Sequence, residues 1–284
     1  MEKNYNTQTY FELEGGHKMP RLCFGTWQIP EGEETYKAVR DALEAGYRHI
    51  DTAFDYGNER SVGRAIRDSG IPRREIFLTT KLSASVKSYN KAREAINESL
   101  DNLDTGYADL YIIHAPWPWE EMGKDYSPQN VEVYQAMQDA LHDGRFMNIG
   151  LSNFDVTDVQ NILDNSETKP AVNQIKLHVG NYPSVLVEYC HAQDIEIVGY
   201  STLGTKSILD NQGIKEMAEH YGATPSQLCV RYSWQHGSAP IVKSLNLEHM
   251  KDNMKIDFII SDEDMKRLDE MPVEKSDDRL PYEE

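Results

Sequence analysis

Four polar residues whose types could reduce a carbonyl group follow consecutive strand-like segments of the chain. Asp51 and Tyr56 come after the segment RHI, Lys81 follows IFLTT, and His114 follows DLYII. The carboxyl ends of parallel strands meet at one end of a barrel, so we expect these four side chains to lie together. A tyrosine, a lysine, an aspartate and a histidine at one site indicate proton transfer to a substrate oxygen.

Each of these four residues has its own expected role in the reduction of a carbonyl group. A free tyrosine keeps its proton up to about pH 10, and a neighbouring ammonium group lowers that pKa by stabilising the phenolate. We therefore expect Lys81 to lower the pKa of Tyr56, and Asp51 to keep Lys81 charged and in place. His114 is expected to hydrogen-bond the carbonyl oxygen, which Tyr56 protonates as a hydride reaches the carbon. Because no side chain can donate a hydride, this chemistry requires a nicotinamide cofactor.

Each of the four residues also has a structural interpretation when it is taken alone. An aspartate after a strand commonly caps a helix, and a lysine at a strand end is commonly solvated. A tyrosine before Gly-Asn often anchors a loop, and a single histidine is often a hydrogen-bonded structural group. Their occurrence together behind adjacent strands is what favours a catalytic site.

The segments that must position these residues alternate between short apolar runs and longer amphipathic ones. We predict eight strands, at Leu22–Gly25, Arg48–Asp51, Ile76–Thr80, Asp109–Ile113, Met147–Leu151, Ala171–Ile175, Glu196–Gly199 and Pro240–Val242. Helical spacing of apolar residues predicts helices between them, at Glu33–Ala45, Asn90–Leu103, Val131–Leu141, Val156–Leu163, Pro183–His191 and Pro225–Gln235.

Eight such alternations in 284 residues predict the α/β class, most simply a closed (β/α)8 TIM barrel. The structural alternative is a doubly wound sheet, which usually carries a glycine-rich turn after its first strand. Here Thr26-Trp27-Gln28-Ile29-Pro30 follow instead. Residues 9–20, with Gly15-Gly16 between two short runs, predict an N-terminal β-hairpin that closes the bottom of the barrel. We expect one barrel domain over residues 1–284, whose polar tail from Pro272 onward covers part of the upper end.

The composition narrows the range of partners. A net charge of −18 repels phosphate backbones and anionic membranes, so we expect neither nucleic-acid binding nor membrane docking. The three cysteines form no C-x-x-C pair, which favours reduced thiols and a cytoplasmic location. The chain shows no apolar run that could span a membrane, no signal peptide and no heptad pattern, so we expect a monomer acting on a small molecule.

Seven segments follow one another in a specific order along nearly the whole chain. They are GYRHIDTAFDYGNE (46–59), TTKL (79–82), DLYIIHAP (109–116), IGLSNF (149–154), PAVNQIKLH (170–178), GYSTLG (199–204) and IVKS (241–244). Together they resemble the aldo-keto reductase family, in particular bacterial members of the diketogluconate reductase and prostaglandin F synthase type. The resemblance implies a (β/α)8 barrel that reduces small aldehydes and ketones with NADPH.

The resemblance also implies roles for individual residues. Tyr56 would be the proton donor, with Asp51, Lys81 and His114 in the roles described above. The implied cofactor contacts are Ser152, Asn153 and Gln174 at the nicotinamide carboxamide, Tyr200 on the nicotinamide ring, Ser201 to Leu203 near the pyrophosphate, Lys243 and Ser244 at the adenosine 2′-phosphate and Asn253 at the adenine, with Thr26 and His249 beside them.

Three positions on the adenosine side depart from the family pattern. His249 replaces the usual arginine, Asn246 replaces a threonine, and the adenine-side acid is shortened to Asp252. A neutral histidine cannot grip a phosphate as the permanently charged, bidentate arginine does. NADPH remains the expected cofactor because Lys243 retains a point charge there, and NADH is the alternative.

The expected substrate pocket departs from the family as well. Ser83 and Ala115 stand where many relatives carry aromatic residues, so the pocket is expected to be wider or more polar. Trp27 matches a usual aromatic wall, whereas Trp117, with Trp119, could replace the missing ones or simply pack a long loop.

Asp55, directly before Tyr56, occupies a position that is commonly apolar in relatives. Facing the pocket, it would repel acidic substrates and favour neutral or hydroxylated ones; the alternative is that it points to solvent.

Two other classes of function remain as alternatives. Some proteins of this fold bind the cofactor as regulatory subunits with little turnover, which the presence of all four catalytic residues disfavours. A metal-dependent barrel hydrolase would use His49, His114 and His178, but no H-x-H pair occurs, so we expect no metal.

Overall fold

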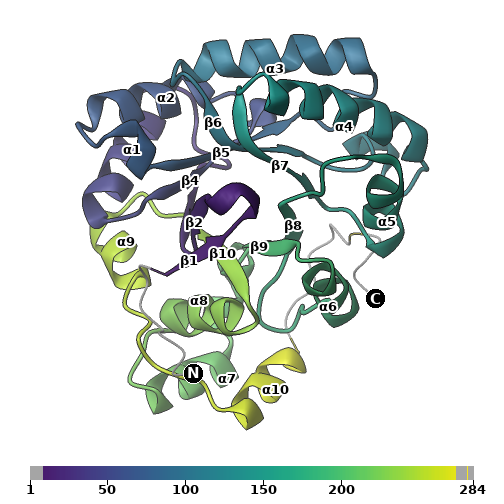
Figure 1. Ribbon diagram of the computed structural model, residues 1–284. Coiled ribbons are helices and arrows are strands. Elements are labelled where there is room, and N and C mark those ends of the chain that lie inside the picture. Colours follow the sequence, from purple (N-terminus) through teal and green to yellow (C-terminus); the bar gives the residue numbers. More distant parts are fainter. Residues whose placement is uncertain (1–8, 273–279, 281–284) are drawn as a thin grey trace.

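The computed structural model of the protein describes residues 9–272 and Leu280, and it shows a closed barrel of parallel strands ringed by helices (Figure 1). Each strand pairs with the next one along the chain, and the last strand closes the ring by pairing with the first. The barrel strands are β3 (Cys23–Gly25), β4 (His49–Asp51), β5 (Phe77–Leu82), β6 (Ala108–Ile113), β7 (Phe146–Ser152), β8 (Val172–Lys176), β9 (Glu196–Tyr200) and β10 (Ser238–Val242). The predicted eight-stranded barrel is therefore confirmed, with each strand at its predicted place.

The helices that follow the strands form the outer layer (Figure 1). They are α1 (Glu33–Ala45), α2 (Glu59–Asp68), α3 (Tyr89–Leu103), α4 (Ser127–His142), α5 (Val156–Asn165), α6 (Ser184–Ala192), α7 (Gln212–His220), α8 (Pro225–Gln235), α9 (Leu247–Asn253) and α10 (Asp262–Asp269). In the described part of the chain, none of them is long and apolar enough to cross a membrane.

Four of these helices, α2, α7, α9 and α10, are absent from the sequence prediction. All four have ten residues or fewer, and α10 buries only Met265 and Leu268, so each offers only a short stretch of local apolar pattern. By contrast α8 begins at Pro225, and the side chains of Thr224 and Gln227 form a reciprocal capping box at its start. Its boundaries are those predicted.

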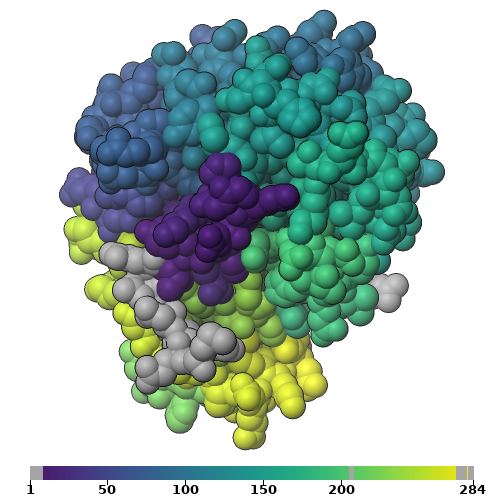
Figure 2. Space-filling model, in the orientation of Figure 1, coloured from purple at the N-terminus to yellow at the C-terminus, as the bar shows by residue number. Residues whose placement is uncertain are grey.

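The predicted N-terminal hairpin is present and closes the amino-terminal end of the barrel. Strands β1 (Tyr10–Glu12) and β2 (Lys18–Pro20) pair antiparallel, joined by a short 3-10 turn, η1 (Glu14–Gly16). Leu13 and Met19 are buried against the first residues of barrel strands, among them Phe77 and Val172. In Figures 1 and 2 the hairpin, in purple, covers the centre of this face. A substrate must therefore reach the barrel from the opposite, carboxyl-terminal end, which we call the mouth.

The predicted polar tail falls mostly outside the described residues, which omit 273–279 and 281–284. Leu280 is described, and it is buried in a small cluster with Ala84, Ala115 and Trp117. These three residues lie just beyond the carboxyl ends of β5 and β6, so this tail residue does contact the mouth.

Candidate active site

Lys81, near the end of β5, is the centre of the polar cluster at the mouth. Its side chain is fully buried, and its Nζ atom donates to Asp51 Oδ1 at 2.6 Å, the Thr52 carbonyl at 2.7 Å and the Tyr56 hydroxyl at 3.3 Å. Three acceptors use all three hydrogens of the ammonium group. Because Lys81 can only donate, the Tyr56 oxygen accepts in this contact, and the phenolic hydrogen is left to point elsewhere. The structure thus brings Asp51, Tyr56 and Lys81 together as predicted.

Tyr56 is held by the tight turn that follows β4. The turn is a 3-10 segment, η2 (Phe54–Tyr56), and it ends at Gly57, whose φ of 65° is a left-handed conformation that glycine adopts without strain. Next comes Asn58, a fully buried side chain that donates to the carbonyls of Thr26 and Ile29 and accepts from Thr52 Oγ1 at 2.7 Å. Asn58 therefore connects the loop that carries Tyr56, which we call the tyrosine loop, to the loop after β3.

The net pKa of Tyr56 differs from the sequence-based expectation. Burial raises the pKa of its phenol to about 12, although the Lys81 charge acts in the opposite, expected direction. The predicted lowering of the Tyr56 pKa is wrong in its net direction, because burial raises this pKa by more than the Lys81 charge lowers it. The consequence is that Tyr56 carries its proton throughout the neutral range.

His114 lies beside Tyr56 at the end of β6. The two rings meet edge to face with centroids 5.6 Å apart, and His114 also contacts the Trp119 ring. Its Nδ1 atom is 3.2 Å from Asp55 Oδ2. Burial lowers the pKa of His114, partly opposed by the hydrogen bond with Asp55, so the ring is neutral at neutral pH. Asp55 thus points to the cluster and not only to solvent.

Amide and hydroxyl groups line the side of the mouth opposite β4. Gln174, on β8, reaches across the barrel and donates from Nε2 to Asp51 Oδ2 at 2.8 Å. Asn153 donates to the His114 carbonyl and to Ser152 Oγ, and the Tyr200 hydroxyl donates to Asn153 Oδ1 at 2.7 Å. The structure thus places the four residues assigned to the nicotinamide in one hydrogen-bonded network, namely Ser152, Asn153, Gln174 and Tyr200.

The residues assigned to the adenosine side lie farther around the same end of the barrel. Lys243, just after β10, is exposed and donates to the Trp27 carbonyl at 2.9 Å and to Gln28 Oε1. Asn246 caps α9 by accepting from the backbone of His249, whose side chain is exposed. Two other residues assigned to the cofactor make hydrogen bonds: the Thr26 hydroxyl donates to the Asp51 carbonyl, and buried Asn253 accepts from Ser226. Ser201 has a left-handed backbone conformation, and Leu203 and Ser244 are half-buried.

The residues predicted to line the substrate pocket lie after the ends of β3, β4, β5 and β6. Ala115 and Trp117 are buried with Leu280, whereas Trp27 is 48% exposed at the end of β3. Ser83 is buried just after β5, and its hydroxyl contributes to lowering the pKa of the Asp55 carboxylate. Ser83 is thus close to the acid that precedes Tyr56, and Ala115 directly follows His114, the hydrogen-bond partner of that acid.

Two sets of functional contacts escaped the sequence reasoning. The first is Thr52 and Asn58, whose backbone and amide groups hold Lys81 and the tyrosine loop. The second is the buried carboxylate of Glu59, which accepts from Thr80 Oγ1 at 2.6 Å and from Ser99 and whose pKa is raised by burial. Both lie in or beside the segment DTAFDYGNE, so a polar Asn-Glu pair directly after the tyrosine turn was an available signal.

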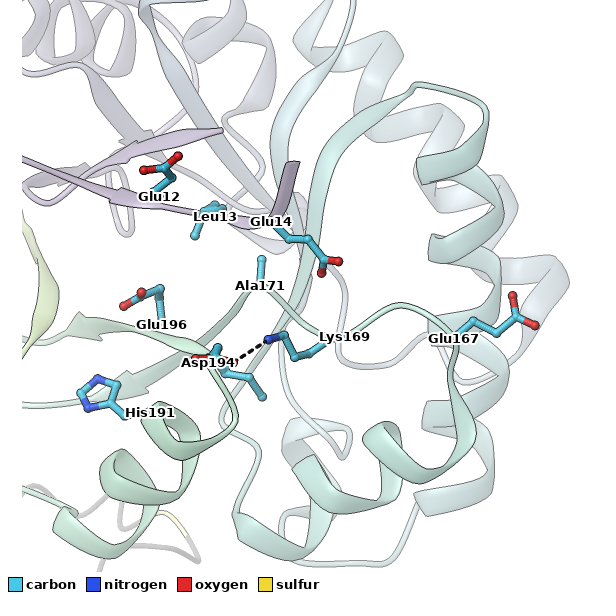
Figure 3. A pocket seen from close by; sticks show the side chains of 10 residues that line it. Glu12, Leu13, Glu14, Glu167, Lys169, Ala171, His191, Asp194 and Glu196 are labelled. Carbon is cyan, nitrogen blue, oxygen red and sulfur yellow. Dashed lines mark ion pairs between the residues drawn. The ribbon is translucent and has the colours of Figure 1, made fainter. Parts of the chain in front are cut away.

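A separate cavity of about 710 Å³ lies at the other end of the barrel, beside the hairpin (Figure 3). Its lining combines hairpin residues with the segments before β8 and β9, and Lys169 pairs there with Asp194 at 3.5 Å. The remaining charged groups around it are mostly acidic, including Glu12, Glu14 and Glu196. This cavity lies away from the cluster around Lys81.

The histidines of the metal-site alternative do not converge. His49 uses both ring nitrogens in hydrogen bonds, with the Pro20 carbonyl at 3.1 Å and Thr79 Oγ1 at 2.9 Å. His178 contacts the Val179 carbonyl through Nδ1. Within residues 9–272 and Leu280, no group of three ligating side chains could hold a metal ion.

A model of the aldo/keto reductase family matches residues 21–272, a span that includes every catalytic candidate. The chain belongs to the aldo/keto reductase family. Among curated proteins, it is 37% identical to the 9,11-endoperoxide prostaglandin H2 reductase of Trypanosoma cruzi over 97% of this chain and 94% of the relative. It is 35% identical to the glyoxal reductase of Bacillus subtilis over 91% of both chains.

Solved structures of aldo-keto reductases have the same fold. One from a Medee basin deep-sea metagenome library has a TM-score of 0.84 at 35% identity and covers 95% of this chain and 99% of its own. The Bombyx mori aldo-keto reductase in complex with NADP has a TM-score of 0.83 at 31% identity, with 92% of both chains covered. The protein is accordingly an NAD(P)H-dependent oxidoreductase of the aldo-keto reductase family.

Proposed function

We propose that this aldo-keto reductase reduces a range of small aldehydes and ketones, with Tyr56 as the proton donor. The observation that carries the proposal is the hydrogen bond from the Lys81 ammonium group to the Tyr56 oxygen. Because the Tyr56 oxygen accepts in this contact, its own phenolic proton remains available to a substrate. Relatives named glyoxal reductase and prostaglandin H2 reductase agree with a carbonyl or similarly oxidised substrate.

The chain's own residues would act as follows. Asp51 and the Thr52 carbonyl hold Lys81 in place and compensate its buried charge. Lys81 stabilises the negative charge that develops on the Tyr56 oxygen as the proton leaves, while burial keeps that proton in place until then. Tyr56 gives its proton to the substrate oxygen. The nicotinamide cofactor supplies the hydride when it is bound.

The donor set at the mouth fits a nicotinamide. A carboxamide both donates and accepts hydrogen bonds, and Ser152, Asn153 and Gln174 offer hydroxyl and amide groups of both kinds. We propose that NADPH is preferred because Lys243 supplies a positive charge at the position assigned to the 2′-phosphate. The preference is expected to be modest, since exposed His249 replaces an arginine.

The test is cofactor oxidation followed by absorbance, with NADPH and NADH side by side, against aldehydes, dicarbonyls and keto esters. Tyr56→Phe is expected to lower kcat/KM by at least about a hundred-fold, while cofactor binding, followed by fluorescence, is retained. Tyr36→Phe removes a hydroxyl from the outer helix layer and serves as the matched control.

Normal ketone turnover by Tyr56→Phe would refute the proton-donor assignment. Cofactor binding with no turnover of any carbonyl by the wild type would favour the regulatory-subunit alternative. Equal use of NADH would show that Lys243 alone does not select the phosphate.

A further inference from the structure

The chain continues from β6 into a loop whose aromatic side chains lie at the mouth. Residues 115–126, which we call the mouth loop, connect β6 to α4. The Trp119 ring meets the His114 ring with centroids 5.5 Å apart, and the Trp117 ring lies 5.3 Å from that of Trp119. Because His114 in turn contacts Tyr56, Trp119 lies one ring away from the proposed proton donor.

Two side chains from outside the mouth loop hold its first two carbonyl groups. Lys87, in the segment between β5 and α3, donates from Nζ to the Ala115 carbonyl at 3.0 Å and to Asn130 Oδ1 at 2.9 Å. Asn130, buried on α4, donates from Nδ2 to the Pro116 carbonyl at 2.9 Å. A chain that has left its sheet needs such donors, because buried carbonyl groups without partners are costly. Lys87 and Asn130 thus form one connected clamp on the start of the mouth loop.

The surroundings of Lys87 fit this contact. Its side chain is half-buried, and its nitrogen lies 5.6 Å from the centre of the Tyr126 ring at the other end of the mouth loop. Burial lowers the pKa of Lys87 to about 7, opposed by the charge of Asp158 on α5. With or without its third proton, the nitrogen keeps at least two hydrogens, one for each of its two acceptors. The clamp therefore does not depend on the charge of Lys87.

The position of the mouth loop bears on how tightly a carbonyl compound binds. The apparent affinity for a ligand falls in proportion to the fraction of molecules whose site is correctly formed. The proton donor is held separately, since Tyr56 and Lys81 are bonded to each other and to groups that follow β4. A loosened mouth loop therefore weakens substrate binding and leaves the reacting groups in place.

We propose that Lys87 is a positioning residue for substrate binding, which acts with Asn130 to hold the mouth loop and its two tryptophans beside His114. This inference rests on the proposed carbonyl reduction and adds a residue outside the catalytic cluster. Removing the amine should raise the KM for the carbonyl substrate and leave both kcat and the affinity for NADPH nearly unchanged.

Lys87→Met keeps the length of the side chain and removes its donor hydrogens. It is compared with the wild type by NADPH oxidation, with benzaldehyde and methylglyoxal as substrates. The KM for each carbonyl compound is expected to rise about five- to ten-fold, whereas kcat and the dissociation constant of NADPH change by less than about two-fold. Lys87→Gln, a shorter side chain with two amide hydrogens, should give a smaller rise. Lys91→Met, at an exposed site of α3, is the control and should behave as the wild type.

A second measurement follows the mouth loop without any turnover. Hydrogen exchange of the unliganded full-length protein, read by mass spectrometry, is expected to be at least about five-fold faster over residues 115–126 in Lys87→Met. The reporters are the amides of Glu121 and Lys124, which donate to the carbonyls of Pro118 and Glu121 within the loop. Peptides from α10 should exchange as in the wild type. If Lys87→Met does not fold, Lys87→Gln carries both measurements.

The two proposals fail in different ways. If the wild type reduces neither compound, the proposed function is refuted, while hydrogen exchange still tests the clamp. If it reduces either one and Lys87→Met leaves the KM or the exchange of the mouth loop unchanged, carbonyl reduction stands and the role of Lys87 is refuted. A kcat that falls as far as kcat/KM would also refute this role, because Lys87 would then act on the reaction and not on substrate binding.

Discussion

At the scale of single residues, the most consequential feature is a lysine buried without any exposure. Burial opposes the charge of Lys81, but Asp51 and Tyr56 outweigh burial and raise its pKa, and the carbonyl of Thr52 accepts a further hydrogen bond from the ammonium group. A buried ion pair of this kind contributes little net stability, yet removing one partner leaves an uncompensated charge in the interior. Lys81 is therefore tied to both catalysis and folding.

Lys81→Met is expected to abolish most carbonyl reduction and to lower the free energy of unfolding by about 3–5 kcal/mol, since Asp51 loses its counter-charge. Urea denaturation followed by circular dichroism measures the loss. The double variant Asp51→Asn/Lys81→Met removes both charges and should recover part of the stability. Lys91→Met, at an exposed position of α3, is the control. A single variant as stable as the wild type would show that Asp51 is compensated without Lys81.

At the scale of elements, the hairpin and the barrel are joined by more than apolar packing. His49, on β4, bonds the carbonyl of Pro20 on β2 and the hydroxyl of Thr79 on β5. Nδ1 must donate to the carbonyl, so Nε2 accepts from the threonine, and the ring is satisfied as a neutral group. Burial lowers the pKa of His49 to about 4.

This depressed pKa makes the stability dependent on pH in a defined direction. The unfolded chain binds a proton on this residue below about pH 6.5, while the folded protein resists it down to about 4. Unfolding therefore takes up a proton within this window, and the stability falls as the pH falls through it. Between about pH 7 and pH 5 the contribution of His49 is a loss of about 2 kcal/mol.

The matching experiment compares urea denaturation at these two pH values for the wild type and His49→Gln. The variant loses the hydrogen-bonding ring, so its stability can be lower at both values, but its difference between them should shrink by about 2 kcal/mol. Exposed His142→Gln should keep the wild-type difference. An unchanged difference in His49→Gln would mean that another group governs the acid sensitivity.

At the scale of the whole molecule, charge and surface composition bear on assembly. The net charge is −18, so copies of the chain repel one another. Within the described residues, the large exposed apolar side chains belong to six segments, at Tyr10, Trp27, Trp119 with Met122, Val185, Leu245 and Ile259. The three cysteines are free and buried.

We accordingly predict a monomer, measured by light scattering after size-exclusion chromatography at low and at physiological salt. At physiological salt, repulsion between surface charges more than about 8 Å apart is largely screened. Association of two copies is then less strongly opposed, so this condition is the more demanding test of a monomer. A mass that rises with protein concentration at physiological salt would contradict the prediction and would point to an interface that the scattered apolar residues do not reveal.

Much of this protein follows from its sequence alone. The alternation of apolar runs and helical periods determined the barrel, because strand and helix periods are local properties of the chain. The positions of Asp51, Lys81 and His114 behind consecutive strands then placed them at one end, since parallel barrel strands all point the same way. Short helices such as α10 escaped prediction because they bury few apolar side chains, and such helices depend on tertiary contacts for their stability.

Only the tertiary structure decided how these groups act on one another. The pKa of Tyr56 depends on whether burial or the Lys81 charge prevails, and burial is a property of the packed molecule. The contact of Asp55 with His114, and the reach of Gln174 across the barrel to Asp51, join residues far apart in sequence. Residue types and spacing determined which groups assemble at the mouth, whereas distances and desolvation, which arise only on folding, determined their protons and partners.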